Sequence, residues 1–238
     1  MPDIRWDWIS RNREDIVQLA IEHLVLVGIS MAIAIAVSLP IAIMVRNRPF
    51  WGGVATYTSG VLYTIPSLAL FAFLVPIVGI GQEPVIIGLV AYALLILISN
   101  AAVGLQSVPG PVRESARGMG LTGRQLLFKV ELPLALPAIM AGIRLATVST
   151  VGIATIGAFV DGGGLGELIW QRGIQRGLFL TPIAVGALVA TLIAIVLDAL
   201  LVGAEWLMKP WERRPLPLSV GRRLAWARPS EWKRAATG

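Results

Sequence analysis

The sequence predicts an all-α polytopic membrane protein with about five transmembrane helices. Apolar residues make up 56% of its 238 residues and charged residues only 14%, whereas soluble domains carry roughly 45–50% and about 25%. The mean hydropathy is +0.77, and the apolar residues gather in long runs that one soluble globule could not bury. This composition excludes disordered and collagenous chains and a soluble enzyme. The ten-residue alternation of a transmembrane β-barrel is absent from the sequence.

Composition also limits the chemistry of the chain. It contains no cysteine and one histidine, which excludes disulfides, thiolate catalysis and zinc–thiolate sites and argues against a transition-metal cluster. We therefore expect no cofactor in this chain. The net charge is +6, but the basic residues lie between and after the apolar runs. That placement is typical of loops beside a lipid bilayer, so no nucleic-acid partner is expected.

Five apolar runs are long enough to cross a membrane, which takes about 20 residues of helix. Their ranges are 19–45, 51–81, 85–108, 132–160 and 178–207. The backbone of a lipid-exposed span must satisfy its own hydrogen bonds, so each run is expected to be helical. The second run is long for one span and contains Pro66 and Pro76. These prolines are expected to kink the run, split it or end it early.

Charge asymmetry predicts the topology. The loops after the first and third runs, together with the tail, hold fourteen basic residues, and the opposite side holds five. Positive loops stay in the cytoplasm, so we expect the N-terminus outside and the C-terminus inside a bacterial cytoplasmic membrane. Residues 1–18 are then an extracytoplasmic segment without features of a cleaved signal. Residues 19–207 form the membrane domain, and residues 208–238 form a basic cytoplasmic tail.

The loop 109–131, between the third and fourth runs, is predicted to contain a short helix. Pro111 suits a helix start, residues 112–119 can form the helix, and Gly120 is expected to end it in a turn with positive φ. Residues 125–131 resemble a second short helix. A stiff helix lying across a cytoplasmic loop could transmit force from a soluble partner to the two adjoining spans.

This loop resembles the EAA signature of permease subunits of binding-protein-dependent ABC importers, which reads E-A-A, x3, G, x9, I, x, L-P. Here it reads Glu114-Ser115-Ala116, three residues, Gly120, nine residues, Val130, one residue, Leu132-Pro133. The departures, Ser115 and Val130, change little volume. The resemblance implies a type I permease fold in which this loop is the coupling helix that docks into a groove on a cytoplasmic ATPase. For Glu114, the simpler alternative is a carboxylate that favours a helix N-terminus.

Longer stretches look like the osmoprotectant branch of this family, which imports glycine betaine, carnitine and choline. They are residues 63–81, 84–105, 116–144 and 154–169. The branch often has an arginine before the asparagine at the end of the third run, where this chain has Ser99 before Asn100, so the substrate stays open. An ABC permease for an amino acid, nitrate or a sulfonate is the alternative, followed by an uncoupled channel or structural subunit.

The resemblance also implies the partners. They are a pair of ATP-binding subunits holding ATP and Mg, an extracytoplasmic substrate-binding protein, and a second permease subunit, identical or related. The chain has no Walker A motif, so we expect a transport subunit that works by ATP-driven alternating access and has no enzymatic activity of its own.

Two charged residues fall inside the runs. Arg144 lies roughly 16 Å and Asp198 roughly 12 Å from the cytoplasmic ends of their helices, at about 1.5 Å per residue. Buried charges in membranes usually face a partner or a cavity. We predict an ion pair between them that joins the fourth and fifth runs, the alternative being that one of them lines the pathway.

A glycine-rich loop follows the fourth run on the outer side. It contains Gly162, Gly163, Gly164 and Gly166. The resemblance favours an external gate or a contact for the binding protein, and a flexible loop is the alternative. His23, near the outer end of the first run, is expected to be a polar residue at the membrane interface.

Overall fold

The structure, a computed structural model, describes residues 4–209. Within these residues it consists of helices and their connections. The α-helices are α1 (Trp6–Arg11), α2 (Arg13–Val45), α3 (Pro49–Thr64), α4 (Ser67–Val78), α5 (Gln82–Gln106), α6 (Gly110–Gly118), α7 (Gly123–Leu126), α8 (Leu132–Ala154), α9 (Gly166–Ile169) and α10 (Leu180–Met208). The chain divides into two units, Met1–Val202 and Gly203–Gly238. All of the features described below belong to the first unit unless stated otherwise.

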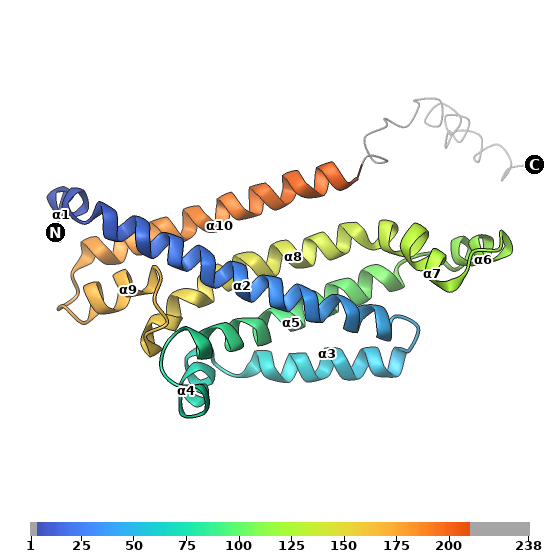
Figure 1. Cartoon of the computed structure of the whole chain (residues 1–238), viewed down its shortest axis with the longest axis horizontal. Helices are drawn as coiled ribbons and strands as arrows, with labels where there is room; N and C mark the ends of the chain where they lie inside the picture. Colours follow the sequence, from blue (N-terminus) through green and yellow to red (C-terminus); the bar gives the residue numbers. More distant parts are fainter. Residues whose placement is uncertain (1–3, 210–238) are drawn as a thin grey trace, which may run out of the picture. The chain divides into compact units, whose positions relative to one another are not determined.

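The core of the first unit is built from α2, α5 and α8. Helix α5 packs along both of the others, and α2 and α8 also contact each other (Figure 1). Small residues let the backbones approach: a Cβ added at Gly104 would lie 2.8 Å from the Cβ of Ala138, and one at Gly142 would lie 2.5 Å from the Cβ of Asn100. Lipid gives no hydrophobic drive for helix association, so such close packing is what holds spans together.

Four helical stretches among the described residues are long and apolar enough to span a membrane. They are Arg13–Val45, Gln82–Gln106, Gly123–Val160 and Leu180–Met208. These stretches coincide with the first, third, fourth and fifth apolar runs and confirm the helical membrane fold. The basic tail expected from residue 208 lies outside the described residues from residue 210 onward.

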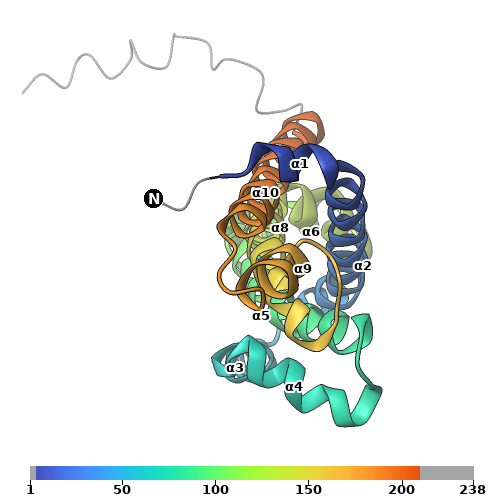
Figure 2. The ribbon, with the colours of Figure 1, turned by 90° about the vertical axis from the view of Figure 1, so that its left-hand side faces the viewer.

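The second apolar run is split into α3 and α4. The break falls at Pro66, whose backbone is extended at φ −57° and ψ 133°. Proline has no N–H to continue a helix and restrains the residue before it to extended conformations. Pro76 lies inside α4 and does not end it at once; the helix stops at Gly79, where φ is +95°. Both short helices pack against α5 (Figure 2).

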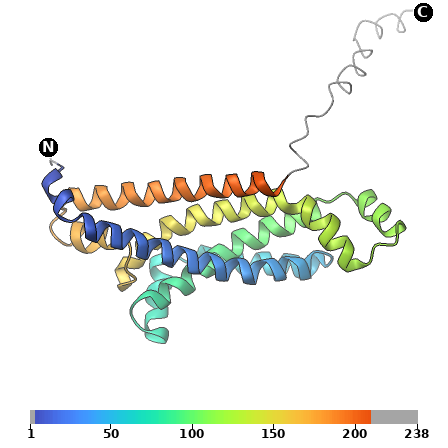
Figure 3. The same ribbon diagram turned by 45° about the horizontal axis from the view of Figure 1, so that its top comes forward.

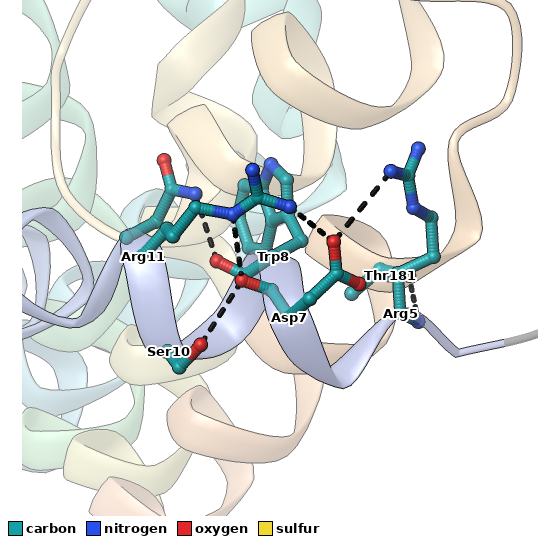
Figure 4. A network of polar contacts seen from close by, with 7 residues as sticks. Arg5, Asp7, Trp8, Ser10, Arg11 and Thr181 are labelled. Atoms are coloured by element: carbon teal, nitrogen blue, oxygen red, sulfur yellow. Dashed lines mark hydrogen bonds and ion pairs between the residues drawn. The ribbon is translucent and has the colours of Figure 1, made fainter.

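Short helices lie at the two ends of the first unit (Figure 3). Helices α6 and α7 lie at one, called here the α6 end, and α1 and α9 lie at the other, called the α1 end (Figure 3). At the α1 end the N-terminal segment is tied to the start of α10. The backbone N–H of Arg5 donates to Thr181 Oγ1 at 3.0 Å (Figure 4). The rings of Trp8 and Phe179 also meet edge to face, with their centroids 5.8 Å apart.

Candidate functional site: the α6 loop and the two ends of the bundle

The α6 end is shaped by two short helices joined at a glycine. Helix α6 covers Gly110–Gly118, close to the predicted range, and Gly120 has a φ of +83°. Thr122 then begins α7 with a capping box: its Oγ1 accepts from the Gln125 N–H at 3.3 Å, and Gln125 Oε1 accepts from the Thr122 N–H at 2.9 Å. Two orphan N–H groups are satisfied reciprocally, which fixes where the second helix starts.

The residues of the signature divide into two groups. Glu114 and Ser115 are exposed on α6, whereas Ala116 is buried. Leu132 and Pro133 are half-buried at the start of α8. The signature residues therefore do not form one group of mutual contacts. Glu114 and Ser115 are available to a partner, and Ala116, Gly120 and Pro133 shape the loop that presents them.

A buried carboxylate that the sequence analysis did not single out lies behind α6. The Glu131 side chain is 2% exposed, accepts a hydrogen bond from Arg46 Nε at 2.9 Å and forms an ion pair with Arg113 Nε at 3.1 Å. Glu131 occupies the one-residue gap of the signature that separates Val130 from Leu132. One signal was available in the sequence. Glu131 directly precedes the fourth apolar run and Arg46 directly follows the first, and the predicted topology places both on the same side of the membrane.

Arg144 and Asp198 face each other across α8 and α10. Arg144 Nε lies 2.8 Å from Asp198 Oδ1, and Arg144 Nη2 lies 3.0 Å from Oδ2. Each side chain is 34% exposed. The guanidinium and carboxylate planes thus meet in a two-point contact, the geometry that gives arginine–carboxylate pairs their strength.

The glycine-rich loop at the α1 end is closely packed. A Cβ at Gly162 would lie 2.5 Å from a methyl group of Val85, and one at Gly166 would lie 2.1 Å from the backbone oxygen of Thr155. Gly163 and Gly164 have φ values of +75° and +68°. This packing does not fit the alternative of a loose, flexible loop.

An arginine clamps the same loop to the start of α2. Arg172 lies 2.7 Å from Asp15 Oδ2 on α2 and 3.1 Å from Glu167 Oε1 on α9. Partial burial lowers the pKa of Arg172, but hydrogen bonds to the two carboxylates outweigh it and raise the pKa above its usual value. The clamp therefore stays charged at every physiological pH.

His23 is not the interfacial residue that the sequence suggested. It is fully buried, its Nε2 lies 3.1 Å from the Val151 carbonyl oxygen of α8, and a Cβ at Gly164 would lie 3.0 Å from its Nδ1. The error arose because distance from a helix end does not reveal which face packs inward. Among residues 4–209, no group of three or more His, Cys, Asp or Glu side chains is placed to hold a metal ion.

We expect Gly166→Ala to destabilise the protein by about 1–3 kcal/mol, because the new methyl group would overlap rigid backbone. Gly28→Ala is the matched control: nothing lies within 4 Å of its added Cβ, and it sits inside α2, so it should be neutral or slightly stabilising. Thermal unfolding in detergent measures both. Equal melting temperatures for the two variants would contradict the close packing of this loop.

The chain matches known families and structures over most of its length. Residues 24–205 match the family described as "Binding-protein-dependent transport system inner membrane component". The carnitine transport permease protein OpuCD of Listeria monocytogenes is 33% identical over 90% of this chain and 95% of its own length. The osmoprotectant import permease protein OsmW of Salmonella typhimurium is 36% identical over 82% and 92%.

Solved structures show the same fold. The MetNI methionine ABC transporter, in an inward-facing conformation, aligns with a TM-score of 0.66 and 25% identity over 84% of this chain and 96% of the matched chain. An amino acid ABC transporter aligns with a TM-score of 0.65 over 85% and 98%. The chain therefore belongs to the inner membrane components of binding-protein-dependent transport systems, the transport subunits of ABC importers, in which ATP hydrolysis resides in a separate subunit.

Proposed function

We propose that this chain forms the membrane pathway of an importer of osmoprotectants such as glycine betaine, carnitine or choline. The observation that carries the proposal is the identity of 33–36%, over more than four-fifths of the chain, with permeases named for carnitine, choline and osmoprotectants. An amino acid is the second candidate, because the similar solved structures are amino acid and methionine transporters.

The α6 end faces the cytoplasm in this proposal, with the N-terminus outside and the C-terminus inside. The support is the excess of basic residues in the loops after the first and third apolar runs and in the tail. Residues 1–18 then lie outside, residues 19–207 form the permease domain with its coupling loop at 109–131, and residues 208–238 form a basic cytoplasmic tail.

Helix α6 is the coupling helix in this proposal. It presents Glu114 and Ser115 to a pair of cytoplasmic ATP-binding subunits, which hold ATP and Mg. A second permease subunit completes the pathway, and a substrate-binding protein docks at the α1 end. ATP closes the ATPase pair, α6 moves with it, and the spans exchange inward-facing for outward-facing states because each ligand binds one state more tightly.

The Arg144–Asp198 pair and the glycine-rich loop keep parts of the permease domain together during this exchange. The Arg144–Asp198 pair keeps α8 and α10 together. The glycine loop with Gly162, Gly163, Gly164 and Gly166, packed on α5 and on the Thr155–Val160 turn, serves as the external gate. The Arg172 clamp supports this role, because it anchors the loop to the outer end of α2.

The test is reconstitution of the chain with its partner ATPase and substrate-binding protein. We expect ATP hydrolysis to rise when the binding protein is loaded with one of the three osmoprotectants, and labelled solute to enter the vesicles. Stimulation by methionine or another amino acid instead would favour the second candidate. If no ATPase co-purifies with the chain, the uncoupled channel becomes the better reading.

A further inference from the structure

We propose that Glu131 is a positioning residue through which movement of α6 reaches α2. The inference rests on the proposed coupling role of α6 and adds the route by which its movement enters the membrane domain. The carboxylate lies behind α6, at the last residue of the π-helical turn η1 (Leu127–Glu131), and its side chain is almost fully shielded from solvent.

Two arginines from different elements pair with this carboxylate. Arg46, directly after α2, donates to Glu131 Oε2, and Arg113, on α6, pairs with Oε1. Arg113 also donates through Nη2 to the carbonyl oxygen of Leu105, near the end of α5, and Arg46 donates through Nη1 to the carbonyl of Ile43. Glu131 therefore joins η1 to α6 and to the end of α2, and Arg113 separately joins α6 to the end of α5.

The connection is stiff for a physical reason. Solvent and salt screen exposed ion pairs but screen buried ones far less, and the Glu131 side chain is 2% exposed while those of Arg46 and Arg113 are 18% and 23% exposed. A displacement of α6 that separated Arg113 from Glu131 would leave a buried carboxylate short of a partner, which is costly. Elements held in this way move together.

The turn that carries Glu131 has π-helical geometry. The Leu132 N–H donates to the Leu127 carbonyl, five residues back, which is a π-type bond. Pro133 favours this wider turn, since its ring cannot donate to Lys129 and would clash with that carbonyl in a regular α-helix. A regular α-turn would rotate Glu131 by about 100° around the helix axis, so the π-turn that Pro133 favours holds Glu131 toward the two arginines. π-turns of this kind are frequent at functional sites.

The cluster holds two arginines and one carboxylate, which allows a clean test. Arg113→Met disconnects α6 and Arg46→Met disconnects α2, and each variant leaves one arginine paired with Glu131. Arg48→Met is the matched control, because Arg48 is exposed two residues from Arg46. The variants are reconstituted with ATPase and binding protein, and co-purified ATPase, ATP hydrolysis and solute imported are measured on each preparation.

We expect Arg113→Met and Arg46→Met to assemble with the ATPase as wild type does, yet to import at least about fivefold less solute per ATP hydrolysed, the scale of a typical coupling between sites. The control should keep the wild-type ratio. An unchanged ratio in both variants, or a loss of import that only follows loss of assembly, would overturn the inference and reduce the cluster to a structural contact.

Lysine variants cover the case in which the methionine variants do not assemble. Arg113→Lys and Arg46→Lys keep a charge beside Glu131 but replace the rigid, planar guanidinium with a flexible ammonium and lose the second bond to Leu105 or Ile43. The contact with Glu131 is then less stiff, so import per ATP should fall in them as well. A normal ratio in both lysine variants would then overturn the inference. A wild type that recruits no ATPase overturns the proposed function and this inference together, whereas a coupled wild type with coupled variants overturns this inference alone.

Discussion

Replacing Glu114 with lysine is expected to abolish the stimulation of ATP hydrolysis by loaded binding protein. Glu114 is exposed on α6, where we place the contact with the ATPase. Losing one partner of a charge pair buried at such an interface costs about 2–5 kcal/mol, which is about 30-fold or more in affinity. The measurement is co-purification of the ATPase followed by its stimulated activity in proteoliposomes.

The simpler view of Glu114 makes a different prediction. A carboxylate that only favours the N-terminus of α6 would belong in its first turn, but no acidic residue lies there and Glu114 is the fifth of nine residues. Glu114→Gln is the graded control: it should weaken stimulation less than Glu114→Lys, with an unchanged melting temperature in the isolated chain. Normal ATPase binding by Glu114→Lys would refute the docking role.

Asp198→Leu or Arg144→Leu alone should lower the melting temperature and the level of protein in the membrane. Each variant leaves one charged group of the pair on a membrane-spanning helix. Inserting a charged residue at the helix centre costs about 2.5–3.5 kcal/mol of free energy by insertion measurements. Partial exposure of both side chains reduces this, so we expect about 1–3 kcal/mol. Thermal unfolding in detergent and immunoblotting of membranes provide the two readouts.

The paired variants separate an interaction from two independent effects. The exchange Arg144→Asp with Asp198→Arg keeps both charges between α8 and α10, so it should recover most of the stability that either single reversal loses. The double leucine variant should also be more stable than both single leucine variants, since it removes both charges of the pair. Additive losses in both double variants would show that the pair contributes no coupling energy.

Much of the membrane fold follows from the sequence because lipid imposes one simple rule. A span must be apolar and must satisfy its own backbone hydrogen bonds, so hydropathy located four of the spans within a few residues, including α5 and α10. The short helix in the loop could also be predicted from the sequence, because prolines and glycines start and end helices through local backbone effects. Arg144 and Asp198 could be matched in advance because helical rise converts residue number into depth.

Tertiary packing decided what local signals left open. Pro66 predicted an interruption of the second apolar run, but whether the run would kink or split into two helices depended on the neighbours of α3 and α4. His23 was expected at the membrane interface and Glu131 was not singled out, and the structure buries both. Sequence position gives the height of a residue along a helix, whereas its burial depends on which face meets another helix. That rotation is set by side chains distant in sequence, such as Arg46 and Arg113 for Glu131, and only the folded chain brings them together.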